Sequence, residues 1–200
     1  GIGFDSGADD LAATFSGGSM TFIKKLTASS SDTLSFVDGA DSVVLDSTYK
    51  EYMFTFNNIH PSDNQPDFQF NFSIDGGSNY NVTKTTTTFY SIHSEDDGTT
   101  AVAYHADFDL AQGTGFQGLA GSVGNTSDES VSGIFRLFNP SSTTFVKHYI
   151  TENQYCNNNT YSQIIYGAGY GNTTSAVDAI QFKMSAGNID AGDICLYGIK

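Results

Sequence analysis

The chain has 200 residues, enough for one domain that buries most of its apolar surface without disulfide staples. A net charge of −14 argues against binding to nucleic acid or to anionic lipid, because like charges would repel. No apolar run approaches the roughly 18 residues of a transmembrane helix, so insertion into a membrane is not expected.

Residues 1–20 are rich in Gly, Ala, Ser and Asp. This composition is typical of an arm or linker that lies on a neighbouring protein. The domain proper is expected over residues 21–200, and it begins with a short strand at TFIKKLTA.

Alternating apolar and polar residues predict three further strands in the first half of the chain, at Thr33–Phe36, Tyr49–Asn58 and Asp67–Ile74. The third is the clearest, and its apolar side chains share one face: Phe68, Phe70, Phe72 and Ile74. We expect Phe70 and Phe72 to be buried together, in the same core as Phe182. The DGG sequence that follows predicts a tight turn.

The second half continues in the same manner. A Thr-rich strand is expected at Thr83–His93, and two weak strands are expected between Ala101 and Gly124. Beyond them we predict a hairpin around NPSS (Val131–Phe138 and Thr144–Ile150), a polar loop (Glu152–Tyr161), a strand (Gln163–Ala168) and a closing hairpin (Val177–Lys200).

About ten short strands without intervening helices favour an all-β fold. The best specific expectation is an antiparallel β-sandwich of the jelly-roll type, with almost no helix.

The sequence contains no catalytic or metal-binding constellation. Serines lack the G-x-S-x-G context, and the four histidines lack metal-ligand spacing. Acidic clusters such as Glu95–Asp97 are explained by turns, although calcium at that cluster is an alternative. Cys156 and Cys195 form no CxxC pair, and free thiols are expected. We therefore predict no enzyme activity, no metal and no cofactor.

Recognition by a loop is the remaining candidate activity. The predicted polar loop combines two aromatic rings with neighbouring amides: Tyr155, Asn157, Asn158, Asn159 and Tyr161. Aromatic faces and amide groups are what a sugar site uses, so these five residues form the candidate glycan-binding site. An ordinary polar loop is the alternative interpretation.

Several phrases occur in a particular order along the chain: ASSSDTLSF, LDSTYKEYMFTFNNI, SIDGGSNY, SGIFRLFNPSSTTFVKH and the closing hairpin with LYGIK. In this order they resemble phrases of a jelly-roll domain found in tail, fibre and head-decoration proteins of tailed bacteriophages. The resemblance covers residues 21–200.

The resemblance implies a virion structural protein that assembles in the host cytoplasm, as a homotrimer, in a tail, a fibre or a capsid decoration. A host-surface glycan and other virion proteins, the latter contacted through Gly1–Ser19, are the expected partners. Two alternatives remain open. A secreted carbohydrate-binding module would be favoured by a signal peptide and occupied glycosylation sequons, and a fragment of a glycan-degrading tailspike by a cleft with paired carboxylates.

Overall fold

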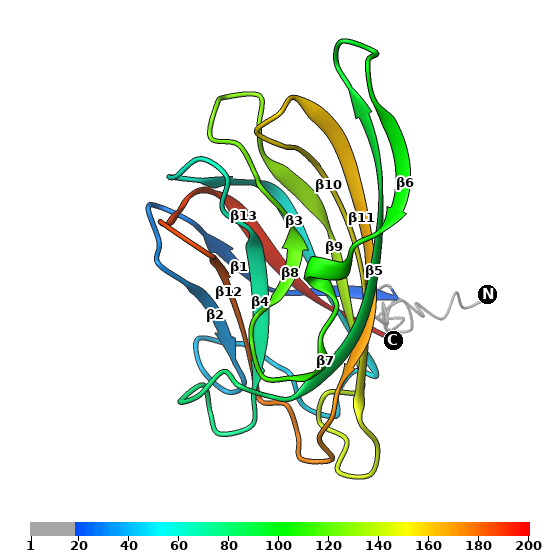
Figure 1. The fold of residues 1–200 in the computed structure, drawn as a ribbon. Helices are drawn as coiled ribbons and strands as arrows, with labels where there is room; N and C mark the ends of the chain where they lie inside the picture. The colour runs from blue at the N-terminus through cyan, green and yellow to red at the C-terminus, as the bar shows by residue number, and fades with distance from the viewer. Residues whose placement is uncertain (1–18) are drawn as a thin grey trace, which may run out of the picture.

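The computed structural model describes residues 19–200, which fold into two antiparallel β-sheets packed face to face (Figure 1). The expectation of an all-β antiparallel sandwich is confirmed. The predicted arm lies outside the described residues except for its last two, and Met20 already belongs to the first strand. Within residues 19–200 no helix is long and apolar enough to cross a membrane.

The larger sheet has nine strands. In spatial order, its main path is β1 (Met20–Thr27), β13 (Ile189–Ile199), β3 (Glu51–Pro61), β9 (Val131–Phe138), β10 (Lys147–Cys156), β11 (Tyr161–Gly171), β5 (Lys84–Ser94) and β6 (Thr100–Tyr104). The short β7 (Ala111–Gly113) also pairs with β5. A single 3₁₀ turn, η1 (Ala106–Phe108), follows β6.

The smaller sheet has four strands, in the order β2 (Leu34–Val37), β12 (Ala179–Met184), β4 (Phe68–Ser73) and β8 (Gln117–Ala120). The first five strands of the chain alternate between the two sheets, and the last two do so again. The first and last segments of the described chain also pair with each other, β1 with β13 and β2 with β12. The finer expectation, a jelly roll, stays a prediction.

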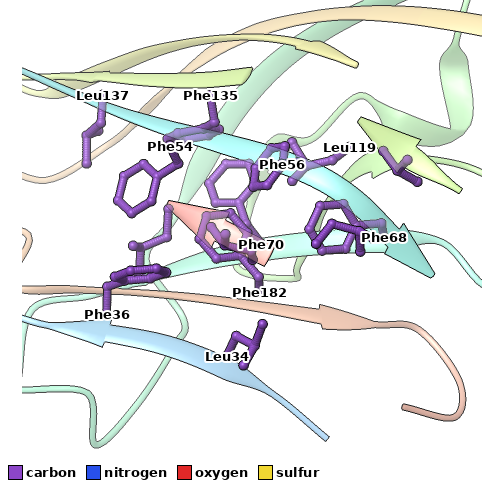
Figure 2. Close-up of a cluster of buried hydrophobic side chains, with 14 of the residues drawn as sticks. Leu34, Phe36, Phe54, Phe56, Phe68, Phe70, Leu119, Phe135, Leu137 and Phe182 are labelled. Atoms are coloured by element: carbon purple, nitrogen blue, oxygen red, sulfur yellow. The ribbon is translucent and has the colours of Figure 1, made fainter. Parts of the chain in front are cut away.

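A cluster of phenylalanine side chains fills the space between the sheets (Figure 2). Phe70, Phe72 and Phe182 are each 0% exposed, as expected from the alternation. Phe182 lies opposite Phe70 in the register of β12 and β4. Its ring lies 5.5 Å from that of Phe54 in a tilted arrangement and 5.2 Å from that of Phe56 edge-on, so the two sheets meet through aromatic contacts.

The second face of β4 is also buried, which the alternation did not predict. Asn71 is 0% exposed because loops cover it, and its Nδ2 donates to the carbonyls of Tyr80 and Thr114. The predicted inward position of Ile74 is wrong. β4 ends at Ser73, and Ile74 is 42% exposed in the turn that follows.

The hairpin after NPSS also differs from the prediction. The strand expected at Thr144–Ile150 runs from Lys147 to Cys156 instead. The side chain of Ser142 accepts hydrogen bonds from the backbone amides of Thr144 and Phe145, which keeps that stretch in a turn. The strand consequently begins later and extends through half of the segment predicted as a polar loop.

Candidate functional site

An open groove of about 630 Å³ lies where the larger sheet extends past the β8 edge of the smaller one. Three regions line it. The inner face of the larger sheet contributes Tyr90, Ile92, Tyr155, Tyr161 and Gln163; the end of β6 and the segment after it contribute Tyr104 to Phe108; and the rim carries Asp67, Gly121, Ser122, Asn157 and Asn159. This volume lies in the range of small-molecule sites.

Strand pairing brings the sheet residues of the groove together. Tyr155 lies opposite Gln163 across β10 and β11, and Gln163 lies opposite Ile92 across β11 and β5. Since paired residues point to the same side of a sheet, these three side chains share the inner face. The consecutive strands β10 and β11 therefore build one wall together with β5, which is distant from them in sequence.

The segment Glu152–Tyr161 is not a polar loop, so that part of the prediction is wrong. Its first half completes β10, and only four residues, 157–160, form a turn before β11. Asn153 misled the interpretation because it is polar but fully buried. Its side-chain Nδ2 donates hydrogen bonds to the carbonyl of Leu119 and to the hydroxyl of Thr151, and these bonds replace the water that the amino group loses on burial.

The five predicted site residues have different roles. Tyr155 is 0% exposed, and its hydroxyl accepts a hydrogen bond from the Gly121 amide, so its ring packs in the core and offers no free face. Asn157 stabilises the turn, because its Oδ1 accepts from the amides of Asn159 and Tyr161. Asn159 is exposed and Tyr161 half-buried, and both line the groove.

Asn158 is the one predicted residue that does not line the groove. Its backbone amide donates to the carbonyl of Ser122, and its side-chain Oδ1 is buried without a protein donor. The contact between Asn158 and Ser122 ties the turn to the segment that follows β8. We therefore assign Asn158 to holding the rim in place.

A stack of three rings forms the wall opposite the turn. The His105 ring lies 4.2 Å from that of Phe108, nearly parallel to it, and 5.3 Å from that of Tyr90, which meets it edge-on. Phe108 is buried, whereas His105 and Tyr90 are half-buried. The packing of His105 between the other two rings holds its ring plane at the groove wall.

Two carboxylates complete the groove, Asp67 and Asp107. Burial raises the pKa of the Asp67 carboxyl, against the hydrogen bond that its Oδ1 accepts from the Ser122 amide at 3.0 Å. The nearby Asp107 carboxylate raises that pKa further, and His105 opposes it. No Lys or Arg side chain lines the groove among the described residues.

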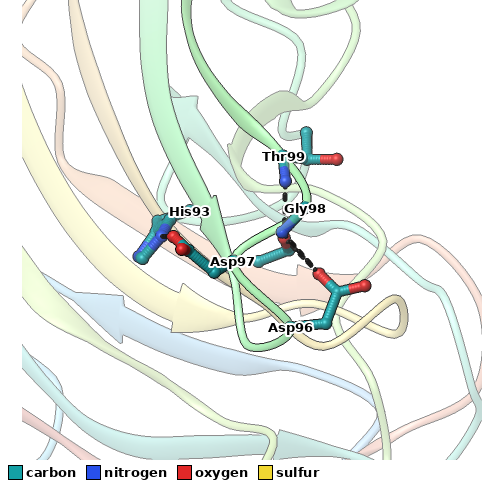
Figure 3. Close-up of polar contacts among 6 residues, drawn as sticks. His93, Asp96, Asp97, Gly98 and Thr99 are labelled. Atoms are coloured by element: carbon teal, nitrogen blue, oxygen red, sulfur yellow. Dashed lines mark hydrogen bonds and ion pairs between the residues drawn. The ribbon is translucent and has the colours of Figure 1, made fainter.

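The acidic cluster Glu95–Asp97 forms the tip of the β5–β6 hairpin (Figure 3). Asp96 accepts hydrogen bonds from the Ser94 hydroxyl and the Gly98 amide, while Asp97 turns the other way and pairs with His93 at 2.9 Å. The two carboxylates thus point apart. Residues 19–200 contain no grouping of three or more metal-ligating side chains.

Both cysteines are free thiols, Cys195 buried and Cys156 half-buried. Burial raises the pKa of the Cys156 thiol, and the acidic residues Glu95 and Glu129 raise it further. Such a thiol is weakly nucleophilic, and neither cysteine lines the groove.

The sequence prediction missed the residues that the fold delivers from other segments: Asp67, Tyr90, Ile92, His105, Asp107, Phe108 and Gln163. Tyr90 and Ile92 lay in a predicted strand, and their alternation placed them on one face. Nothing in the sequence indicated that this face extends beyond the smaller sheet. Comparison with protein-family models, curated proteins and solved structures gave no match to this chain.

Proposed function

We propose that this chain is an adhesive module that binds a glycan in the groove and performs no chemistry on it. The observation that supports this proposal is the combination of two half-buried tyrosines on the sheet wall, Tyr90 and Tyr161, with an exposed amide and two carboxylates in the same groove. Aromatic rings pack against the apolar face of a sugar. Amides donate hydrogen bonds to its hydroxyls and accept them, while carboxylates accept hydrogen bonds from these hydroxyls.

The charge of the groove narrows the class of glycan. Asp67 and Asp107 are acceptors, and no Lys or Arg lines the groove among the described residues. A sulfated or carboxylated sugar would bring a like charge to these carboxylates and would be repelled. We therefore propose a neutral or amino-bearing oligosaccharide as the ligand.

The setting of this module is proposed from the sequence resemblance. It is a structural protein of a bacteriophage particle, in a tail, a fibre or a capsid decoration, which assembles as a homotrimer and contacts other virion proteins through Gly1–Ser19. A secreted carbohydrate-binding module would use the same groove. Linked copies would raise a weak single-site affinity by orders of magnitude, which suits attachment to a repetitive host surface.

Cleavage of the bound glycan is the second candidate function. It is favoured by the two carboxylates in one groove, one of which, Asp67, has a raised pKa as a general acid requires. Against this function, the Asp67 carboxylate already accepts a hydrogen bond from the Ser122 amide, and this bond stabilises the ionised form of the carboxylate. Shortening of an oligosaccharide by the protein, abolished in Asp67→Asn, would establish this second function in place of the first.

Removing the groove aromatics should weaken binding while leaving the fold intact. Tyr161→Ala and Tyr90→Ala are each expected to raise the Kd for the glycan about tenfold, a change of about 1.4 kcal/mol. A glycan array identifies the ligand, and titration calorimetry then measures the affinity.

Two variants control this experiment. Tyr170→Ala removes a half-buried tyrosine of the same strand, β11, outside the groove, and should bind like the parent protein. Tyr155→Phe keeps the buried ring and removes only the hydroxyl. If both groove variants bind as tightly as Tyr170→Ala, the groove is not the site.

A further inference from the structure

The larger sheet has an outward face, turned away from the smaller sheet, that nothing in the described structure covers (Figure 1). Eight large hydrophobic side chains are exposed within residues 19–200, and six of them lie on this face: Met20, Phe22, Phe89, Val102, Tyr104 and Ile150. Their exposed fractions run from 50% to 76%. We refer to this surface as the outer sheet face.

Two apolar clusters lie at opposite ends of the outer sheet face. The first is built on β5, β6 and β11, where Phe89 lies opposite both Tyr104 and Tyr166 and stacks on the Tyr166 ring at 5.2 Å. The second is built on β1 and β13, where Phe22 meets Tyr197 edge-on at 5.7 Å beside Met20. Ile150 lies between the clusters on β10.

The charge of the outer sheet face differs from that of the whole molecule. At the outward positions that the strand ladders pair, this face carries two cations and three carboxylates apart from histidines, a net charge of −1 against −14 for the chain. These groups already have partners. Lys25 pairs with Asp193 at 3.3 Å, Arg136 pairs with Glu51, and Glu152 accepts from the Tyr166 hydroxyl.

This distribution selects a second copy of the same chain as the occupant. Two acidic molecules repel each other through most of their surfaces, and they repel least through a face whose charges are internally neutralised. A basic partner would instead require exposed, unpaired carboxylates on the contact surface. An apolar face with its charges satisfied fits an equally apolar face.

The face has room for two neighbours. Eight strands about 4.8 Å apart, each about 27 Å long, cover roughly 900 Å². Since the two clusters lie at opposite ends, the first cluster of one copy can meet the second cluster of the next, and each such contact uses about half of the face, roughly 450 Å² from each partner against about 800 Å² in a standard interface. A head-to-tail contact closes into a three-membered ring when it turns each copy by a third of a revolution, and in that ring every copy makes two contacts.

We propose that the outer sheet face is the self-association surface of this protein, on which a second copy docks with its Phe22 cluster against the Phe89 cluster. This inference does not rest on the glycan groove, which opens on the inner side of the same sheet, although Tyr104 at the end of β6 contributes to both surfaces. Groove variants such as Tyr161→Ala should therefore leave the assembly intact.

Light scattering on the full chain tests the proposal through the Phe89→Asp variant. The parent protein should have a mass that is a multiple of 21.4 kDa, and Phe89→Asp should have the monomer mass. Phe145→Asp is the matched control, because Phe145 is 68% exposed but lies in the loop before β10, away from both clusters. It should keep the parent mass.

A second variant keeps the test decisive. If circular dichroism shows that Phe89→Asp is unfolded, Val102→Asp replaces it. Val102 is 76% exposed, the highest fraction on this face, so its replacement disturbs the packing of the fold least. A parent protein that is monomeric over the whole concentration series overturns the proposal. So does a folded variant that retains the parent mass, which would place self-association elsewhere, for example in residues 1–18.

Discussion

Truncation of Phe182 to Ala is expected to lower the free energy of unfolding by about 3–5 kcal/mol. Phe182 is 0% exposed at the centre of the core, where its ring contacts those of Phe54, Phe56 and Phe68, the last in a stacked arrangement. Removal of the ring leaves a cavity between the two sheets. The surrounding strands cannot close it, because their spacing is fixed by the backbone ladders.

Urea unfolding followed by circular dichroism measures this loss. Phe145→Ala is the control, since an exposed ring buries little area, and its effect should stay within about 0.5 kcal/mol. A loss below about 1 kcal/mol for Phe182→Ala would contradict the packing of β12 against the larger sheet.

Replacement of Lys84 by Met should remove a large pH dependence of stability. Lys84, the first residue of β5, is 0% exposed, and its ammonium group donates to Asn71 Oδ1 at 2.5 Å and to the Val82 carbonyl at 2.8 Å. It forms no ion pair with any described carboxylate. Burial lowers the pKa of this amine to about 7.

The direction of the effect follows from the two pKa values. In the unfolded chain the amine has a pKa near 10.5, so the unfolded state binds more protons between pH 7 and pH 10.5. The resulting destabilisation is absent above pH 10.5, grows as the pH falls, and is complete below pH 7. Between pH 9 and pH 6 the parent protein should therefore lose about 2–3 kcal/mol relative to Lys84→Met.

Urea unfolding of both proteins across this pH range provides the comparison. Contributions from carboxylates and tyrosines are common to the two proteins and cancel in the difference. Met also leaves Asn71 Oδ1 satisfied, because the Phe72 amide donates to it at 2.9 Å. Parallel stability profiles for the two proteins would show that Lys84 stays charged in the folded state.

The sequence predicted those parts of the fold in which burial follows alternation. Phe68, Phe70 and Phe72 at every second position of β4 are buried, as the alternation predicted. The prediction was incorrect where a polar residue is buried with its own hydrogen bonds. Asn153 in β10 looked like part of a loop, because an alternation rule counts an amide as exposed.

The candidate site was predicted only in part, for a geometric reason. Asn159 and Tyr161 were recognised from their local composition, and both line the groove. Tyr155 was assigned to the site for the same reason, but it alternates inward on β10 and is buried. Asp67 and His105 are far from this turn in sequence, and only the strand order β10, β11, β5, β6 and the edge position of β8 bring them to it.

The most direct test of the glycan-binding proposal is an NMR titration of the assembled, isotope-labelled protein with its array-selected oligosaccharide. The proposal predicts chemical-shift changes at the amides of Asp107, Ser122, Asn159 and Tyr161, and an oligosaccharide whose mass is unchanged after prolonged incubation. Shift changes confined to the outer sheet face around Phe89 and Phe22 would contradict the groove as the binding site. Shortening of the oligosaccharide would contradict the non-enzymatic function.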